Sequence, residues 1–266
     1  MHDIHISSTA MELQYMRSLK TIILACSMAI LPGLSAAGEF QVSPIMLDLG
    51  KTKKSGTITV SNVGTDKINL QIQATEWKQD TEGKDLYSET NDIIYFPKIV
   101  SVDKGDSQLI RVGIKEGLIA HEKAYRLYIQ EIPDPGKTSS DKAKFQIAVM
   151  IRFGVPIFIK PAVENLKGMV EPVTVERGTA TAVVKNAGNV HFRITKVVVR
   201  GRTPDGQEAF SRELDGWYLL AGAAREYSVP VPQDVCNKLA LIEVSVKAEE
   251  LTFSGVHSIT KEMCHP

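Results

Sequence analysis

Apolar and polar residues alternate in short runs along most of the chain. In Thr57-Ile58-Thr59-Val60, and again at Leu70, Ile72 and Ala74, every second side chain is apolar, which is typical of a strand that buries one face. No run after the N-terminal segment keeps the period of a helix. The pattern predicts strands at 56–62, 68–77, 108–114, 124–131, 145–159, 178–185, 191–200, 225–231 and 239–248.

Turn residues separate these runs and indicate the fold class. Asn62-Val63-Gly64, Pro204-Asp205-Gly206 and Asn186-Ala187-Gly188 stand between predicted strands, where such residues favour turns. Many short strands at this spacing favour β-sandwiches over βαβ units. We therefore expect an all-β protein with two Ig-like β-sandwich domains in tandem. Pro161 cannot donate to a sheet ladder, so the predicted domains are 38–160 and 161–266.

The N-terminal segment has the pattern of a secretory signal peptide. Arg17 and Lys20 precede an apolar run at 21–34, and Ser35-Ala36-Ala37 follows it. A basic region, a short apolar stretch and a small-x-small exit are the three parts of such a signal. We expect residues 1–37 to be removed on export, with Met16 as a candidate initiator. An N-terminal membrane anchor is the alternative, although the run is short for a membrane span.

Charge and cysteine content narrow the class of protein further. Lys plus Arg and Asp plus Glu both total 31, so the net charge is zero, which argues against binding to nucleic acid or to an anionic membrane. Cleavage would leave Cys236 and Cys264, and two cysteines in an exported chain suggest one disulfide. Two free thiols remain the alternative, because sequence spacing does not fix the geometry.

The sequence contains no set of residues that would support an enzyme. His121, His191, His257 and His265 are scattered without the spacing of metal ligands. There is no Gly-x-Ser-x-Gly elbow and no glycine-rich phosphate loop. We therefore expect a binding protein with no metal, no cofactor and no ATP site.

The segment 144–161 is the most informative one. Phe145, Ile147, Val149 and Ile151 fall on one face of its predicted strand. Such a strand either fills the core of its own sandwich or, at a sheet edge, offers these side chains to a partner that lacks a strand. Periodicity alone does not decide between the two.

Seven pieces of the N-terminal half follow one another in a recognisable order. They are FQVSPI at 40–45, VSNVG at 60–64, YSE at 87–89, FP at 96–97, LIRV at 109–112, EKAYRLYIQEIP at 122–133 and VPIFIKP at 155–161. In this order and spacing the chain resembles the periplasmic pilus chaperones of the chaperone–usher pathway, and especially their archaic branch.

The resemblance implies a function. A member of this family would insert its last N-domain strand into a pilus subunit that lacks a strand, here with Phe145, Ile147, Val149 and Ile151 as donors. It would then deliver the subunit to an outer-membrane usher for fibre assembly, without ATP. A free chaperone of this kind would cover its apolar edge, for example by self-association. An exported two-domain Ig-like adhesin or fimbrial structural protein is the alternative, and an exported enzyme is a weaker one.

The resemblance also implies an anchor for the carboxylate at the subunit's C-terminus. Better-known branches use an Arg near the mature N-terminus and a Lys late in the donor strand, but here the N-terminal strand has no Arg and Pro156 takes the Lys position. Arg126 and Arg152 are the expected replacements, since guanidinium groups bind carboxylates in a bidentate manner. Ordinary ion pairs are the alternative for both. Glu131 and Lys160 stand at the family's positions for an interdomain charge pair.

Overall fold

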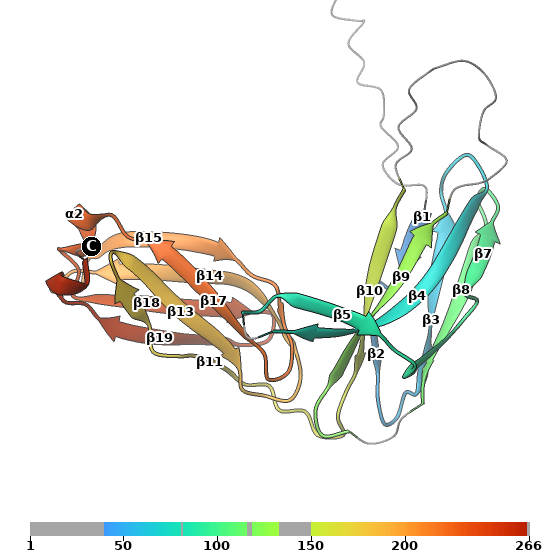
Figure 1. The fold of residues 1–266 in the computed structure, drawn as a ribbon, viewed down its shortest axis with the longest axis horizontal. Helices are drawn as coiled ribbons and strands as arrows, with labels where there is room; N and C mark the ends of the chain where they lie inside the picture. The colour runs from blue at the N-terminus through green and yellow to red at the C-terminus, as the bar shows by residue number, and fades with distance from the viewer. Residues whose placement is uncertain (1–39, 81, 116–118, 133–149, 265–266) are drawn as a thin grey trace, which may run out of the picture. The chain divides into compact units, whose positions relative to one another are not determined.

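The computed structural model describes residues 40–80, 82–115, 119–132 and 150–264. Residues 38–266 form one compact unit. The fold is all-β, with four sheets arranged as two sandwiches (Figure 1), which confirms the predicted fold class. Within the described ranges, no helix is long and apolar enough to cross a membrane.

In the described residues, the first sandwich has ten strands in two sheets. One sheet has the order β1-β3-β8-β6, and the other has the order β2-β10-β9-β4-β5, with β7 paired to β4. The bounds in the first sheet are β1 Phe40–Ser43, β3 Ser55–Asn62, β8 Ser107–Ile114 and β6 Ile93–Phe96. Those in the second sheet are β2 Leu47–Leu49, β10 Arg152–Ile159, β9 Lys123–Glu131, β4 Ile68–Gln79, β5 Asp85–Glu89 and β7 Ile99–Val102.

The N-terminal segment of this sandwich contributes one strand to each sheet. β1 pairs antiparallel with β3, whereas β2, only four residues farther along the chain, pairs parallel with β10. The chain crosses from one sheet to the other at the cis peptide bond between Ser43 and Pro44. This crossing decides how much of β10 is covered.

The second sandwich also has two sheets. The first consists of β11 Gly168–Val170, β13 Thr179–Asn186, β12 Thr174–Glu176 and β17 Ala224–Pro230. The second consists of β15 Glu208–Asp215, β14 Phe192–Arg202, β18 Leu241–Ala248, β19 Thr252–Ser258 and β16 Tyr218–Leu219. The short helices α2 (Gln233–Cys236) and η2 (Lys261–Cys264) are joined by a disulfide between Cys236 and Cys264.

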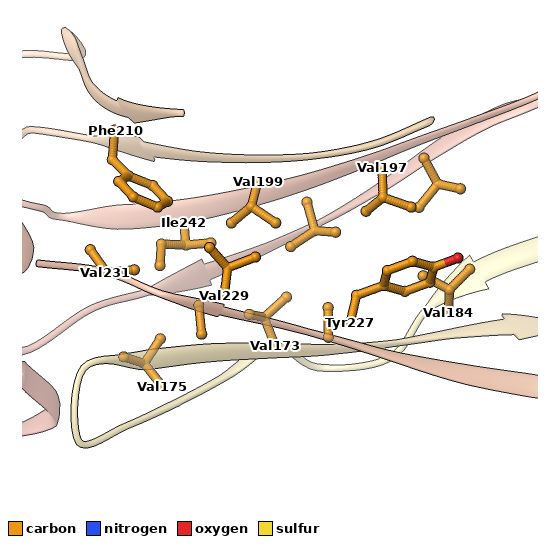
Figure 2. Packing of buried hydrophobic residues seen from close by; sticks show 14 of the residues in the cluster. Val173, Val175, Val184, Val197, Val199, Phe210, Tyr227, Val229, Val231 and Ile242 are labelled. Atoms are coloured by element: carbon orange, nitrogen blue, oxygen red, sulfur yellow. The ribbon is translucent and has the colours of Figure 1, made fainter. Parts of the chain in front are cut away.

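Each sandwich has its own apolar core. In the first, the core-facing residues of β9 and β10 include Leu127, Ile129, Val155 and Ile157, all fully buried. In the second, side chains of the two sheets point toward one another and interlock (Figure 2). The labelled examples include Val175, Val184 and Val229 from one sheet and Val199, Phe210 and Ile242 from the other.

Candidate functional site

One side of β10 is open over half of its length. β9 pairs with β10 from Arg152 to Ile159, but β2 pairs with its other side only from Ile157 to Ile159. Among the described residues, nothing pairs with the outer side of β10 from Arg152 to Pro156. Unpaired backbone groups along a strand form a template for a further strand.

Hydrogen bonding shows which groups point to this open edge. The Glu131 N–H donates to the Ile151 carbonyl over 3.0 Å, so this pair belongs to the hydrogen-bonded set of the antiparallel ladder. Because bonded and non-bonded pairs alternate, the backbone groups of Arg152, Gly154 and Pro156 point away from β9. Pro156 offers only a carbonyl there, because proline has no N–H.

The sheet face opposite the core carries the two arginines. Residues of β9 and β10 alternate between faces, and their odd-numbered members fill the core. The even-numbered ones therefore share the outer face, where Arg126 lies beside Pro156 and Tyr128 lies beside Gly154. Arg152 lies two residues before Gly154 on the same face of β10. Arg126, Tyr128 and Arg152 therefore share one face next to the open edge.

Arg126 is buried and is held by an aromatic ring. The side chain is 8% exposed, and its guanidinium carbon lies 3.9 Å from the ring centroid of Trp77. Nη1 donates to the Gly154 carbonyl over 3.3 Å, while Nε is buried and has no partner within the described part of the chain. Among the described residues, no carboxylate forms a salt bridge with Arg126.

Arg152 is exposed and lies over a tyrosine. Its guanidinium carbon is 3.7 Å from the ring centroid of Tyr128, and Tyr128 meets Tyr87 of β5 edge-to-face at 6.0 Å. Burial, and then the charge of Asp85, raise the pKa of Tyr87 to about 12 against the opposing effect of Arg126. The Tyr87 hydroxyl is therefore neutral at physiological pH, and the arginines supply the charge on this face.

The predicted donor residues are described only in part. Phe145, Ile147 and Val149 lie outside the described residues. Ile151 is half-buried next to the first residue of β10. Their role stays a prediction.

The structure does not bring Glu131 and Lys160 together, so the expected charge pair is not formed. β9 and β10 run antiparallel, which places Glu131 beside Ile151, whereas Lys160 follows the other end of β10. Lys160 pairs instead with Asp48 at 3.3 Å and with Glu164 at 3.7 Å. Matching sequence positions one at a time could not reveal that the two residues lie at opposite ends of a strand pair.

A different pair links the two sandwiches, and the sequence did not indicate it. Glu122 Oε1 accepts the backbone N–H of His191 over 2.9 Å and lies 2.8 Å from His191 Nδ1. The imidazole stacks on Phe158 with ring centroids 3.5 Å apart. The side-chain amide of Gln79 bonds the Tyr218 carbonyl and the Leu220 N–H. Each partner is distant in sequence, so no local pattern joins them.

A second exposed surface lies on the other sheet of the first sandwich. Ile94 and Phe96 of β6 and Leu109 and Arg111 of β8 are all exposed on its outer side, and Phe96 is 73% exposed. We call these four residues the β6–β8 patch. Contiguous apolar surface of this kind usually marks a contact with another molecule.

Metal ligands do not gather in the described residues. Among them, no group of three or more His, Cys, Asp or Glu side chains could hold an ion. The described residues present an open strand edge beside two guanidinium groups that no described carboxylate neutralises.

One family model matches the first sandwich. A family model described as "Pili and flagellar-assembly chaperone, PapD N-terminal domain" matches residues 39–164. A search of curated proteins found no match.

Solved structures show the same fold at low sequence identity. The chaperone–adhesin pre-assembly complex CsuC–CsuE from the archaic Csu pili of Acinetobacter baumannii matches with a TM-score of 0.56 and 18% identity, covering 82% of this chain and 98% of that one. The class 5 fimbriae chaperone CfaA matches with a TM-score of 0.56 and 14% identity, covering 83% and 100%. The YadV chaperone matches with a TM-score of 0.55 and 13% identity, covering 84% and 100%.

Proposed function

We propose that this chain is a periplasmic pilus chaperone of the PapD-like family, because the model of that family's N-terminal domain matches residues 39–164. It would bind pilus subunits by donor-strand complementation and deliver them to an outer-membrane usher. The observation that carries this proposal is the open edge of β10 beside Arg126 and Arg152. An edge of this kind gives a subunit's strand its hydrogen bonds.

The end of the open edge indicates where the carboxylate of a subunit would be anchored. A strand added to β10 reaches Pro156 and stops there, because β2 covers the next residues. Arg126 lies directly beside Pro156, without a described carboxylate partner. The C-terminal carboxylate of a subunit strand ending at this point would meet Arg126, with Arg152 farther back along the edge. Phe145, Ile147, Val149 and Ile151 remain the proposed donors to the subunit's core.

We propose that the usher contacts the β6–β8 patch. This patch belongs to the β1-β3-β8-β6 sheet, whereas the open edge belongs to the other sheet. A subunit and an usher could therefore bind at the same time. Exposed apolar side chains with one arginine suit a protein partner.

Several further assignments belong to the same proposal. We place the chain in the archaic branch, because Pro156 occupies the position of the usual Lys and the N-terminal strand has no Arg. We also propose domains at 38–160 and 161–266, a cleaved signal peptide at 1–37 and self-association that covers the open edge of the free chaperone. An unpaired edge would otherwise promote aggregation.

The test is co-expression of the tagged mature protein with the fimbrial subunit genes that neighbour its own gene, followed by pull-down. We expect wild type to retain a subunit. Arg126→Ala, Arg152→Ala and the double variant Ile147→Thr with Ile151→Thr should each lose it. Arg200→Ala is the matched control, because Arg200 lies on a strand of the second sandwich and pairs with Glu208.

The results separate the parts of the proposal. If only the arginine variants lose the subunit, the anchor is right and the donor assignment is wrong. If wild type retains nothing and the subunits are stable without it, the chain is an exported binding protein of another kind, such as a two-domain adhesin.

A further inference from the structure

The two arginines are placed by aromatic rings and not by opposite charges. Arg126 stacks on Trp77 and Arg152 stacks on Tyr128, and neither has a salt bridge to any described carboxylate. A guanidinium that lies flat on a ring keeps its N–H groups free around its own edge, in a plane parallel to the ring. Stacking therefore fixes the position of the cation without consuming the donors that a carboxylate needs.

Gly154 provides the space that this arrangement requires. A Cβ at Gly154 would lie 3.0 Å from Tyr128 Cε1 and 3.3 Å from Cδ1, and 3.9 Å from Arg126 Cδ. The Tyr128 ring thus rests directly on the glycine backbone, next to both arginine side chains. These contacts are tighter than ordinary van der Waals distances, so even alanine at position 154 would require the ring to shift by a few tenths of an ångström.

Gly154 also holds Arg126 directly. Its carbonyl accepts Arg126 Nη1 over 3.3 Å, and this carbonyl is one of the groups that point to the open edge. One glycine therefore supports the ring beneath Arg152 and fixes the orientation of Arg126. A substitution at this single position should disturb both cations.

We propose that Tyr128, resting on Gly154, and Trp77 are positioning residues that hold Arg152 and Arg126 ready for the planar carboxylate at the end of a bound chain. The inference rests on the proposed anchor and adds the residues that determine its geometry. The rings touch the cations and not the ligand. They act by keeping two forks of N–H donors in place before the ligand arrives, which lowers the ordering cost of binding.

The test uses fluorescence of Trp77. The chain has two tryptophans, Trp77 and Trp217, so Trp217→Phe leaves only the indole that lies beneath Arg126. This protein is titrated with a synthetic decapeptide copying the C-terminus of the subunit that co-purifies with wild type. The peptide is used once with a free carboxylate and once as the C-terminal amide. We expect a change in Trp77 emission and tighter binding for the free acid.

Three substitutions are compared in that background. Tyr128→Leu removes the ring, Gly154→Ala displaces it, and Tyr128→Phe keeps the ring without the hydroxyl. We expect the first two to weaken binding of the free acid about tenfold, the size of one well-formed cation–π contact. Tyr128→Phe should bind as wild type does. Binding of the amide should not change in any variant.

Gly113→Ala is the matched control. Gly113 is also a strand glycine with ordinary backbone angles, and a Cβ there would lie no closer than 3.7 Å to any neighbour. Urea unfolding of every variant shows whether weaker binding comes from an unfolded protein or from an altered binding site.

Each outcome decides one point. If Tyr128→Leu and Gly154→Ala are folded and bind the free acid as wild type does, while Arg152→Ala does not, the positioning role is wrong and the anchor stands. If wild type binds acid and amide equally, the anchor itself fails. If Tyr128→Phe is as weak as Tyr128→Leu, the hydroxyl and not the ring is responsible, and the inference is overturned.

Discussion

At the scale of single residues, two buried asparagines have the same role in the two sandwiches. Asn62 ends β3, and its amide donates to the carbonyls of Asp66 and Val102. Asn186 ends β13, and its amide donates to the carbonyls of Val190 and Leu219. Each side-chain oxygen also accepts an N–H two residues later. Each asparagine therefore ties a turn to a neighbouring segment inside the sandwich.

We predict that Asn186→Ala lowers the free energy of unfolding by about 2–4 kcal/mol. The substitution would leave two carbonyls and the Gly188 N–H without partners, and each buried unsatisfied group costs about 1–3 kcal/mol before relaxation. Urea denaturation followed by circular dichroism measures the change. Asn69→Ala is the control, because the Asn69 side chain bonds Ser101 at an exposed position. Equal effects of the two substitutions would contradict the prediction.

The sequence predicted that these asparagines stand in turns, but not that their side chains are buried. Asn62-Val63-Gly64 and Asn186-Ala187-Gly188 were expected to be turns from residue type alone. Nothing in a pattern of alternation says that the asparagine side chain points inward, because this depends on which strands pass beside it. The same applies to Arg126, whose burial against Trp77 comes from the pairing of β4 with β9.

At the scale of elements, the long strands with one apolar face were predicted, whereas short apolar strands such as β2, β6 and β7 and the mostly polar β15 were missed. β15 was not expected, and only Phe210 is fully buried among its eight residues. It is an edge strand, so most of its side chains meet solvent. The expected strand at 145–159 begins at Arg152 in the described part of the chain. Its open edge is set by β2, which no property of the 145–159 sequence could indicate.

Asp92 connects the start of β6 to the other sheet of the first sandwich. Its Oδ2 accepts the Tyr125 hydroxyl over 2.9 Å and lies 3.5 Å from Lys123 Nζ. The Tyr125 hydrogen bond, followed by the charge of Lys123, holds the pKa of Asp92 below its ordinary value despite some desolvation. The folded state therefore favours the carboxylate form.

We predict that Asp92→Asn reduces the loss of stability in acid. A lowered pKa means that the stabilisation is present above the ordinary Asp pKa of about 3.9 and disappears as the pH falls through the lower folded value. The difference in unfolding free energy between pH 7 and pH 3 should thus be smaller in the variant than in wild type. Urea titrations at both pH values provide the measurement. An unchanged difference would show that Asp92 does not contribute to the pH dependence.

At the scale of the whole molecule, the two sandwiches are joined by a small set of specific contacts. Trp77, Ala124 and Phe158 of the first sandwich pack with Leu220 of the second. The Gln79–Leu220 and Glu122–His191 hydrogen bonds are next to this cluster, since Gln79 follows Trp77 by two residues and Glu122 precedes Ala124 by two. Trp77 belongs to it and also contacts Arg126, so the proposed carboxylate anchor would depend on how firmly the sandwiches are joined.

We predict that Glu122→Ala separates the unfolding of the two sandwiches. The variant leaves the His191 N–H without its acceptor and removes the partner of the stacked imidazole. A lost hydrogen bond to a charged group costs about 1.5–3 kcal/mol. Calorimetry should then resolve two transitions where wild type shows a more cooperative one. Glu213→Ala, at an exposed pair with Lys196, should leave the profile unchanged, and a single unchanged transition in Glu122→Ala would contradict the prediction.

The position of β2 determines which polypeptides can occupy the open edge completely. A docked strand can extend only as far as Pro156, because Leu47 already lies beside Ile157. A partner that places its carboxylate there must have no further residues, since any extension would collide with β2. The three residues of β2 would thus limit how far the C-terminal end of a bound strand can extend. Under the proposed function, a finished subunit would therefore be accepted, and one carrying a translational read-through or an added C-terminal tag would be refused.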